Sequence, residues 1–255
     1  MSIIKNDIPI LEYDNDQAGV IAANHEHESL HLPERAVFAF LGEAVDRYAK
    51  THGAVIVDHY ETISKLYPIY VLEKDGQQIC LVEAPVGAPA ATAILDALIA
   101  CGVRKIISGG SCGVLVPMEE NVFLIPRKAL RDEGTSYHYL PPERFVTVSE
   151  AARKAIAATL QSRHLPFSEV VTWSTDGFFR ETKGMVEYRK SEGCSVVEME
   201  CAALAACAQF RGAAWGELLF TADTLANAER YDARDWGRDS IDLALELCME
   251  AVLHL

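Results

Sequence analysis

The sequence lacks any apolar run long enough to cross a membrane, which takes about 18 residues or more. Its first residues, Met1 to Asp7, include charges and precede Pro9, so we expect no secretory signal peptide there. Basic residues are scarce, because 23 Lys and Arg stand against 37 Asp and Glu, for a net charge of −14. Since phosphate backbones are bound by clustered Lys and Arg, we predict no nucleic-acid partner. The lack of an apolar span predicts no membrane partner.

Cysteines in a pairing or ligating pattern are also missing. The seven cysteines are an odd number, lie within apolar runs, and show no Cys-x-x-Cys or Cys/His spacing. This pattern predicts free core thiols, a reducing cytoplasmic location and no metal site. The histidines of His25-Glu26-His27-Glu28 and His31 offer metal-binding side chains, but their polar setting favours a solvated arm.

No linker rich in Pro, Gly or Ser divides the chain, and no internal repeat is visible. At 255 residues, half of them apolar, the chain is long enough for one large domain with a substantial core. We therefore predict an irregular N-terminal arm over residues 1–34 and a single domain over residues 35–255.

Within this domain, short apolar runs alternate with segments that have helical character. We predict strands over residues 36–41, 69–72, 78–82, 105–107, 122–125, 170–173, 196–197 and 217–221. We predict helices over residues 43–52, 89–100, 149–163, 200–211 and 239–253. Lys74-Asp75-Gly76 indicates a hairpin turn. This alternation predicts an α/β fold, with a central mixed, mainly parallel sheet flanked by helices on both faces.

Polar or glycine-rich segments follow four of the predicted strands. They are residues 108–113, residues 174–180, Glu198-Met199-Glu200 and Asp223. Ligands of such folds bind at the carboxyl ends of strands, so we expect these segments to form one site. The two glutamates flank a methionine inside an apolar run, and buried carboxylates usually have partners or a chemical role.

In this order, these segments resemble the nucleoside phosphorylase family of the purine and uridine type, which includes related nucleosidases. Val197-Glu198-Met199-Glu200 is similar to the most specific signature of the family. Thr221-Ala222-Asp223 is similar to its purine branch, and residues 133–139 are similar to its uridine branch. The resemblance runs from about residue 79 to the C-terminus. It implies a nucleoside phosphorylase-like fold and cleavage of the N-glycosidic bond of a nucleoside.

The resemblance also implies roles for single residues in binding a nucleoside. Glu200 would bind ribose hydroxyls and Met199 would pack on the sugar. Glu198 would either contact the ribose or only orient this loop. Phe178 would stack on the base, and Arg180 is either a second base contact or a surface arginine.

Asp223 is the catalytic candidate. The resemblance implies that its carboxyl protonates, or hydrogen-bonds to, the ring nitrogen of a departing purine. This role requires a carboxyl that burial or a partner keeps partly protonated.

The phosphate site departs from the family pattern. Ser111 matches the family's hydroxyl beside phosphate, and the backbone N–H groups around Gly110 would help to bind an anion. Ser108, however, stands where the phosphorylases carry an arginine, and Tyr60 stands where a second arginine is expected after His59. Serine cannot replace the charge of arginine.

The first phosphate loop departs from the family as well. The stretch from Gly42 and Glu43 to Arg47 has one residue more than the family's Gly-Asp-Pro-x-Arg, which leaves Arg47 as the candidate cation. In related nucleosidases an acidic residue near this loop activates water, so Glu43 or Asp46 is a candidate for that role.

Three functions remain open from the sequence. The first is a nucleoside phosphorylase of purine salvage, purine favoured and uridine possible, with phosphate as co-substrate and no other cofactor. The second is a hydrolytic nucleosidase that uses water, and the third is a non-catalytic nucleoside-binding protein. The family builds its sites at subunit interfaces, so we expect a homodimer or hexamer.

Overall fold

The computed structural model describes residues 3–227 and 229–255. Its strands are β1 (Arg35–Ala39), β2 (Val55–Glu61), β3 (Leu66–Lys74), β4 (Gln77–Glu83), β5 (Lys105–Val114), β6 (Phe123–Asp132), β7 (Phe145–Thr147), β8 (Phe167–Thr175), β9 (Val196–Glu198) and β10 (Ala214–Thr224). Its α-helices are α1 (Glu43–Thr51), α2 (Ala88–Ala100), α3 (Glu150–Ser162), α4 (Lys183–Ser191), α5 (Cys201–Phe210) and α6 (Ile241–Ala251). Strands β2 and β7 and helix α4 were not predicted from the sequence.

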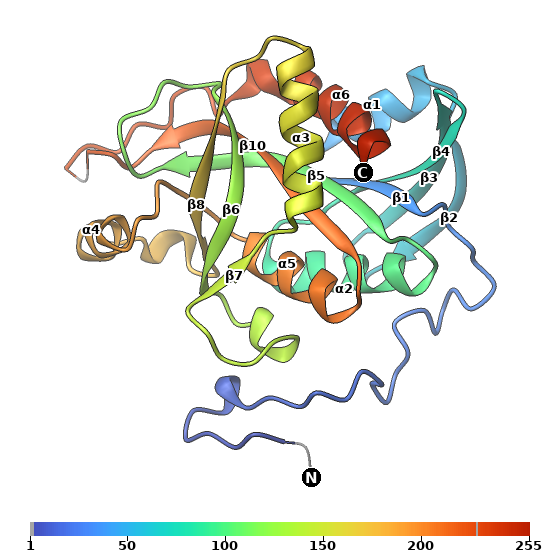
Figure 1. Cartoon of the computed structure of the whole chain (residues 1–255), viewed down its shortest axis with the longest axis horizontal. Helices are drawn as coiled ribbons and strands as arrows, with labels where there is room; N and C mark the ends of the chain where they lie inside the picture. Colours follow the sequence, from blue (N-terminus) through green and yellow to red (C-terminus); the bar gives the residue numbers. More distant parts are fainter. Residues whose placement is uncertain (1–2, 228) are drawn as a thin grey trace.

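All the strands belong to one mixed sheet. Parallel pairs join β1 to β4 and β5, β10 to β5, and β8 to β6 and β9. The predicted hairpin joins β3 and β4, with Asp75 at φ 49° and Gly76 at φ 73°, as a type I′ turn requires. The predicted α/β class and the mixed sheet are therefore confirmed (Figure 1).

The sheet closes on itself at one end, which the sequence pattern did not predict. Strand β10 pairs with β5 on one side and with β6 on the other. Since β6 pairs with β8, β8 with β9, and β9 with β5, these five strands form a closed ring. Closure brings the ends of β5, β8, β9 and β10 to one place.

Strand β5 is longer than predicted, because residues 108–113 continue the strand rather than form a glycine loop. Gly109 has a packing role there: a Cβ at this position would lie 2.7 Å from Cys248 Sγ of α6. Glycine is therefore needed for the close approach of α6 to the sheet and not for a turn.

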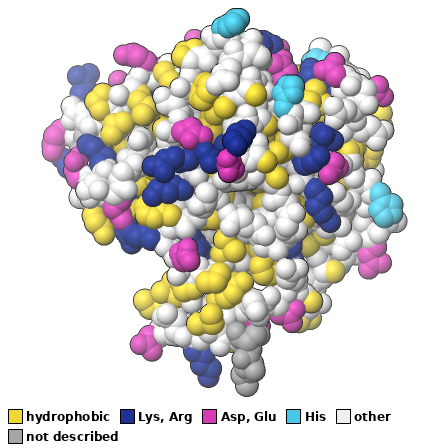
Figure 2. Space-filling view, in the orientation of Figure 1, with side chains coloured by type: hydrophobic (Ala, Val, Ile, Leu, Met, Phe, Trp, Pro, Cys, Tyr) yellow, Lys and Arg dark blue, Asp and Glu magenta, His cyan; other side chains and the backbone are white. Residues whose placement is uncertain are grey.

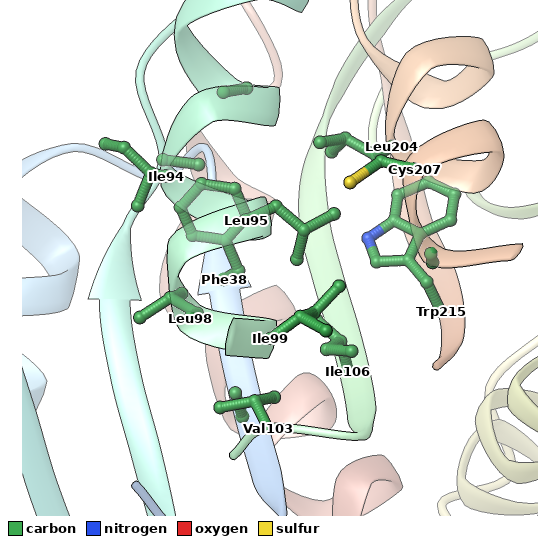
Figure 3. Close-up of a cluster of buried hydrophobic side chains, with 14 of the residues drawn as sticks. Phe38, Ile94, Leu95, Leu98, Ile99, Val103, Ile106, Leu204, Cys207 and Trp215 are labelled. Carbon is green, nitrogen blue, oxygen red and sulfur yellow. The ribbon is translucent and has the colours of Figure 1, made fainter. Parts of the chain in front are cut away.

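Helices cover both faces of the sheet. Figure 1 shows α1, α3 and α6 on one side and α2 and α5 on the other. One core lies between α2, α5 and the sheet, where Figure 3 shows Leu95, Phe38, Ile106, Leu204 and Trp215 packed together. A second core lies under α1, α3 and α6. The N-cap predicted at Ser149 is present, since its side chain accepts from the N–H of Ala152.

The N-terminal arm runs along the outside of the domain and is irregular apart from one turn of 3₁₀-helix at Pro9–Leu11. It is tied to the domain by Leu32 N–H donating to the carbonyl of Cys101, at 2.9 Å, and by Arg211 donating to the carbonyl of Gln17, at 2.6 Å. On the face in Figure 2, Lys and Arg side chains lie among Asp and Glu side chains.

All seven cysteines are buried free thiols. In residues 3–227 and 229–255, no group of three or more His, Cys, Asp or Glu side chains is arranged to hold a metal ion. Within the same residues, we find no helix with the length and apolar character that a membrane crossing requires.

The core beside α2 predicts that the same substitution, isoleucine to alanine, changes the free energy of unfolding very differently at a buried and at an exposed position. Ile94 on α2 is fully buried, whereas Ile63, between β2 and β3, is fully exposed. Ile94→Ala should lower the free energy of unfolding by about 2–5 kcal/mol, because it removes buried apolar atoms and leaves a cavity. Ile63→Ala should change it by less than about 0.5 kcal/mol. Urea unfolding of both variants checks this, and equal effects would contradict the assigned core.

Candidate active site

Two adjoining cavities lie where the strand ends meet. The inner cavity, of about 170 Å³, is lined by the end of β5, the turn between β9 and α5, and two carboxyls of β10. The outer cavity, of about 590 Å³, is lined mainly by aromatic and apolar side chains. Phe178, Glu181, Asp223 and Trp236 line both cavities, so the two form one continuous site.

Glu198 holds the turn between β9 and α5 in place. Its Oε1 accepts from Thr172 Oγ1 at 3.0 Å and from Ser174 Oγ at 2.6 Å, both on β8. Its Oε2 accepts from the backbone N–H groups of Glu200 and Cys201, each at 2.6 Å. Burial raises the pKa of Glu198 while these hydrogen bonds oppose the shift. Both oxygens are used, so the contacts of Glu198 in this structure orient the loop and cap the first turn of α5.

Glu200 faces the inner cavity beside Met199. Only 7% of Glu200 is exposed, and its Oε1 accepts from the N–H of Gly87 at the start of α2. Gly87 has φ 102°, a conformation that favours glycine. Burial, and next the charge of Glu198, raise the pKa of Glu200 to about 8. This carboxyl therefore exchanges between donor and acceptor forms near neutral pH, which suits a sugar hydroxyl.

Asp223 shares its surroundings with a second carboxyl that the sequence reasoning missed, Glu181. Burial raises the pKa of Asp223, whereas a hydrogen bond from Tyr231 lowers it. Burial, and then the charge of Asp223, raise the pKa of Glu181 to about 7. In the sequence, Glu181 could have been identified as an acidic residue three positions after Phe178, the predicted base contact. A carboxyl with a pKa of about 7 is partly protonated near neutral pH, so Glu181 can carry a proton in the same cavity as Asp223.

Phe178 and Arg180, predicted together as base contacts, are separated in the structure. Phe178 lines both cavities and packs edge-on against Phe179, with ring centroids 4.9 Å apart. Arg180 is exposed and is not among the residues that line either cavity.

The predicted phosphate residues of β5 are also divided. Gly110 and Ser111 line the inner cavity, and Ser111 is exposed. Ser108 is fully buried, and its hydroxyl accepts from Trp215 Nε1 at 3.0 Å, so it does not face the cavity. Glu217 of β10, opposite Ser108 in the sheet, does line it.

The residues of the first loop lie away from both cavities. Gly42 ends the loop at φ 53°, and Glu43 begins α1 as an exposed residue. Arg47 of α1 pairs with Asp242 of α6 at 2.6 Å. Asp46 accepts from Tyr70 OH at 2.8 Å. None of these four residues lines the inner or the outer cavity.

The inner cavity therefore contains several acidic side chains and, among the described residues, no basic side chain. Its lining includes Glu181, Glu198, Glu200, Glu217 and Asp223. No Lys or Arg of the described residues belongs to that lining, and Lys183 lines only the outer cavity. An anion placed in the inner cavity would face these carboxyls without a cationic partner.

Comparison with known proteins identifies the family. Residues 34–252 match the model of the phosphorylase superfamily, and the chain belongs to that superfamily. Guanosine phosphorylase of Halorubrum lacusprofundi is 24% identical over 196 residues, which cover 74% of this chain and 81% of that protein. Uridine phosphorylase of Salmonella typhimurium is 24% identical over 147 residues, 52% of this chain and 58% of that protein.

Solved structures of the same fold include enzymes of both kinds. AMP nucleosidase from Bacteroides thetaiotaomicron superposes with a TM-score of 0.71 at 22% identity, covering 87% of this chain and 88% of that one. Uridine phosphorylase from Vibrio fischeri gives a TM-score of 0.72 at 19% identity, covering 90% and 100%. The predicted family and fold are confirmed, and so is the predicted enzyme class, which spans nucleoside phosphorylases and N-glycosidic hydrolases.

The raised pKa of Glu200 predicts a specific pH dependence of stability. The folded chain keeps this proton between the ordinary value of 4.5 and about 8, whereas the unfolded chain loses it. The stabilising contribution of the protonated Glu200 carboxyl is therefore fully present below pH 4.5 and is lost as the pH rises towards 8. Glu200→Gln cannot titrate, so its stability relative to wild type should increase with pH, by at most about 1.4 kcal/mol per unit. Urea unfolding across this range checks the trend, and parallel curves would contradict it.

Proposed function

We propose that this protein cleaves the N-glycosidic bond of a purine-like nucleoside with water, releasing the free base and the free sugar. The observation that carries the proposal is the inner cavity, whose carboxyls have no cationic partner among its lining residues. Phosphate in proteins is typically held by arginine or lysine. A neutral water molecule needs no such cationic partner.

The arrangement of the site fits the charges that develop when this bond breaks. The sugar gains positive charge as the bond to the base lengthens. Glu200 and Met199 line the inner cavity together, so the sugar would bind there with its hydroxyls on Glu200. A carboxylate beside the sugar stabilises the developing cation.

The base would occupy the region shared by the two cavities. Phe178 offers an aromatic face for stacking there, and Asp223 and Glu181 offer a proton. When the glycosidic bond breaks, its electron pair stays on the base, and the proton from Asp223 neutralises it. A purine carries a ring nitrogen that accepts this proton, which favours purines over pyrimidines.

Phosphorolysis is the second candidate. It is favoured by the exposed hydroxyl of Ser111 in the inner cavity and by the names of two sequence relatives, guanosine phosphorylase and uridine phosphorylase. The two reactions release the same base and differ in their need for phosphate.

The first test is therefore a panel of purine and pyrimidine nucleosides assayed for free base with and without phosphate. With phosphate removed by dialysis, we expect base release to continue at an unchanged rate, fastest with a purine. A reaction that stops without phosphate, and returns when phosphate is added, would establish phosphorolysis instead.

The second test concerns the proton. Asp223→Asn should lower kcat for the preferred purine nucleoside by about 100-fold or more, since a positioned acid contributes at least that factor. A para-nitrophenyl riboside, whose leaving group needs no proton, should lose much less. Asp232→Asn is the matched control, because Asp232 lies in the segment that follows β10, is exposed and does not line the inner cavity. Equal losses on both substrates would refute the role of Asp223.

A further inference from the structure

Glu217 is a buried carboxyl that the binding of base and sugar does not use. It lies on β10, is only 2% exposed, and lines the inner cavity. Its Oε2 is buried and has no hydrogen-bond partner in the structure. A buried polar oxygen without a partner costs free energy, so one that faces a cavity indicates a ligand that completes it.

The position of Glu217 separates it from the leaving base. Asp223, near the end of the same strand, lines both cavities, whereas Glu217 lines the inner cavity alone. With the base in the region that the two cavities share, Glu217 lines the part of the site left for the sugar and the attacking group. The attacking group must approach the sugar from the side away from the base.

We propose that Glu217 holds and deprotonates the water that attacks the sugar, a role that rests on the proposed hydrolysis. The water oxygen forms a bond to the anomeric carbon while the bond from that carbon to the base breaks. The water proton passes to the Glu217 carboxylate, and the electron pair of the broken bond leaves with the base. Asp223 supplies the proton that the base takes up.

The other acids considered for this role are engaged or distant. Both oxygens of Glu198 accept hydrogen bonds from β8 and α5, and Glu200 accepts from Gly87. Glu43 and Asp46, the candidates from the sequence, lie on α1 and do not line the cavity. Glu217 is thus the acid with a free buried oxygen at this place among the described residues.

The surroundings of Glu217 suit a side chain that accepts a proton. Burial raises its pKa well above the ordinary value, and the charges of Glu198 on β9 and Glu200 at the start of α5 raise it further. A hydrogen bond from the thiol of Cys201 on α5 opposes this rise, and the other titratable groups near Glu217 are the thiols of Cys112 on β5 and Cys248 on α6. A carboxylate with a raised pKa is a stronger base, and activity should increase with pH as Glu217 ionises.

Glu217→Gln tests the role directly in phosphate-free buffer. We expect kcat to fall by about 100-fold or more while KM changes little, and the rise of activity with pH to disappear. The matched control is Glu133→Gln, because Glu133 is also a buried carboxyl with one oxygen lacking a partner but lines neither cavity. Near-normal kcat in Glu217→Gln with an unchanged pH profile would overturn the proposal.

A second variant, Glu217→Ala, keeps the test decisive if the amide disturbs folding. Azide is a small nucleophile that needs no proton acceptor, and in Glu217→Ala its charge takes the place of the removed carboxylate, so adding it should restore base release and form a glycosyl azide. Azide should not rescue Asp223→Asn, which lacks the acid. A folded Glu217→Ala that azide does not rescue would overturn the role of Glu217. A wild-type enzyme that needs phosphate would instead overturn the proposed hydrolysis, so the two failures are distinguishable.

Discussion

The four hydrogen bonds of Glu198 are the interaction on which the site depends. They join two side chains of β8 to two backbone N–H groups at the start of α5. Together with the hydrogen bond from the Ala202 N–H to Ser174 Oγ, they hold the turn that carries Met199 and Glu200 against the closed ring of strands. Glu198, which stands out in the sequence as one of two carboxyls inside an apolar run, thus acts mainly as a support, and it fixes the position of its neighbour Glu200 beside the inner cavity.

The burial of the carboxyls in the inner cavity imposes a second constraint. Several carboxyls gather in one cavity, with no Lys or Arg among its described lining residues; burial, and next the charges of neighbouring carboxyls, raise the pKa values of Glu200, Glu217 and Glu181. We propose that such a site favours a neutral nucleophile over an anionic one. In the proposed reaction, Asp223 with Glu181 supplies the proton to the leaving nucleobase, and Glu217 accepts the proton of the attacking water. One strand, β10, thereby carries both Asp223, the proposed proton donor, and Glu217, the proposed proton acceptor.

Much of this fold was predictable from the sequence, because apolar runs and a few turn residues specify it locally. The hairpin at Asp75-Gly76 and the cap at Ser149 are examples. Closure of the ring was not predictable, since the pairing of β10 with both β5 and β6 depends on contacts far apart in the chain. The same reason hid Glu217: it lies within an apolar strand, and only the fold places it in the cavity. Arg47 stood near a recognisable motif, but its helix carries it to Asp242.

The central claim is that water, rather than phosphate, attacks the sugar. The most direct measurement is the mass spectrum of the sugar product formed from a purine nucleoside with both nucleophiles present, in phosphate buffer. The account predicts free pentose, with no sugar phosphate at any stage of the reaction. Accumulation of a pentose 1-phosphate in proportion to the released base would contradict it.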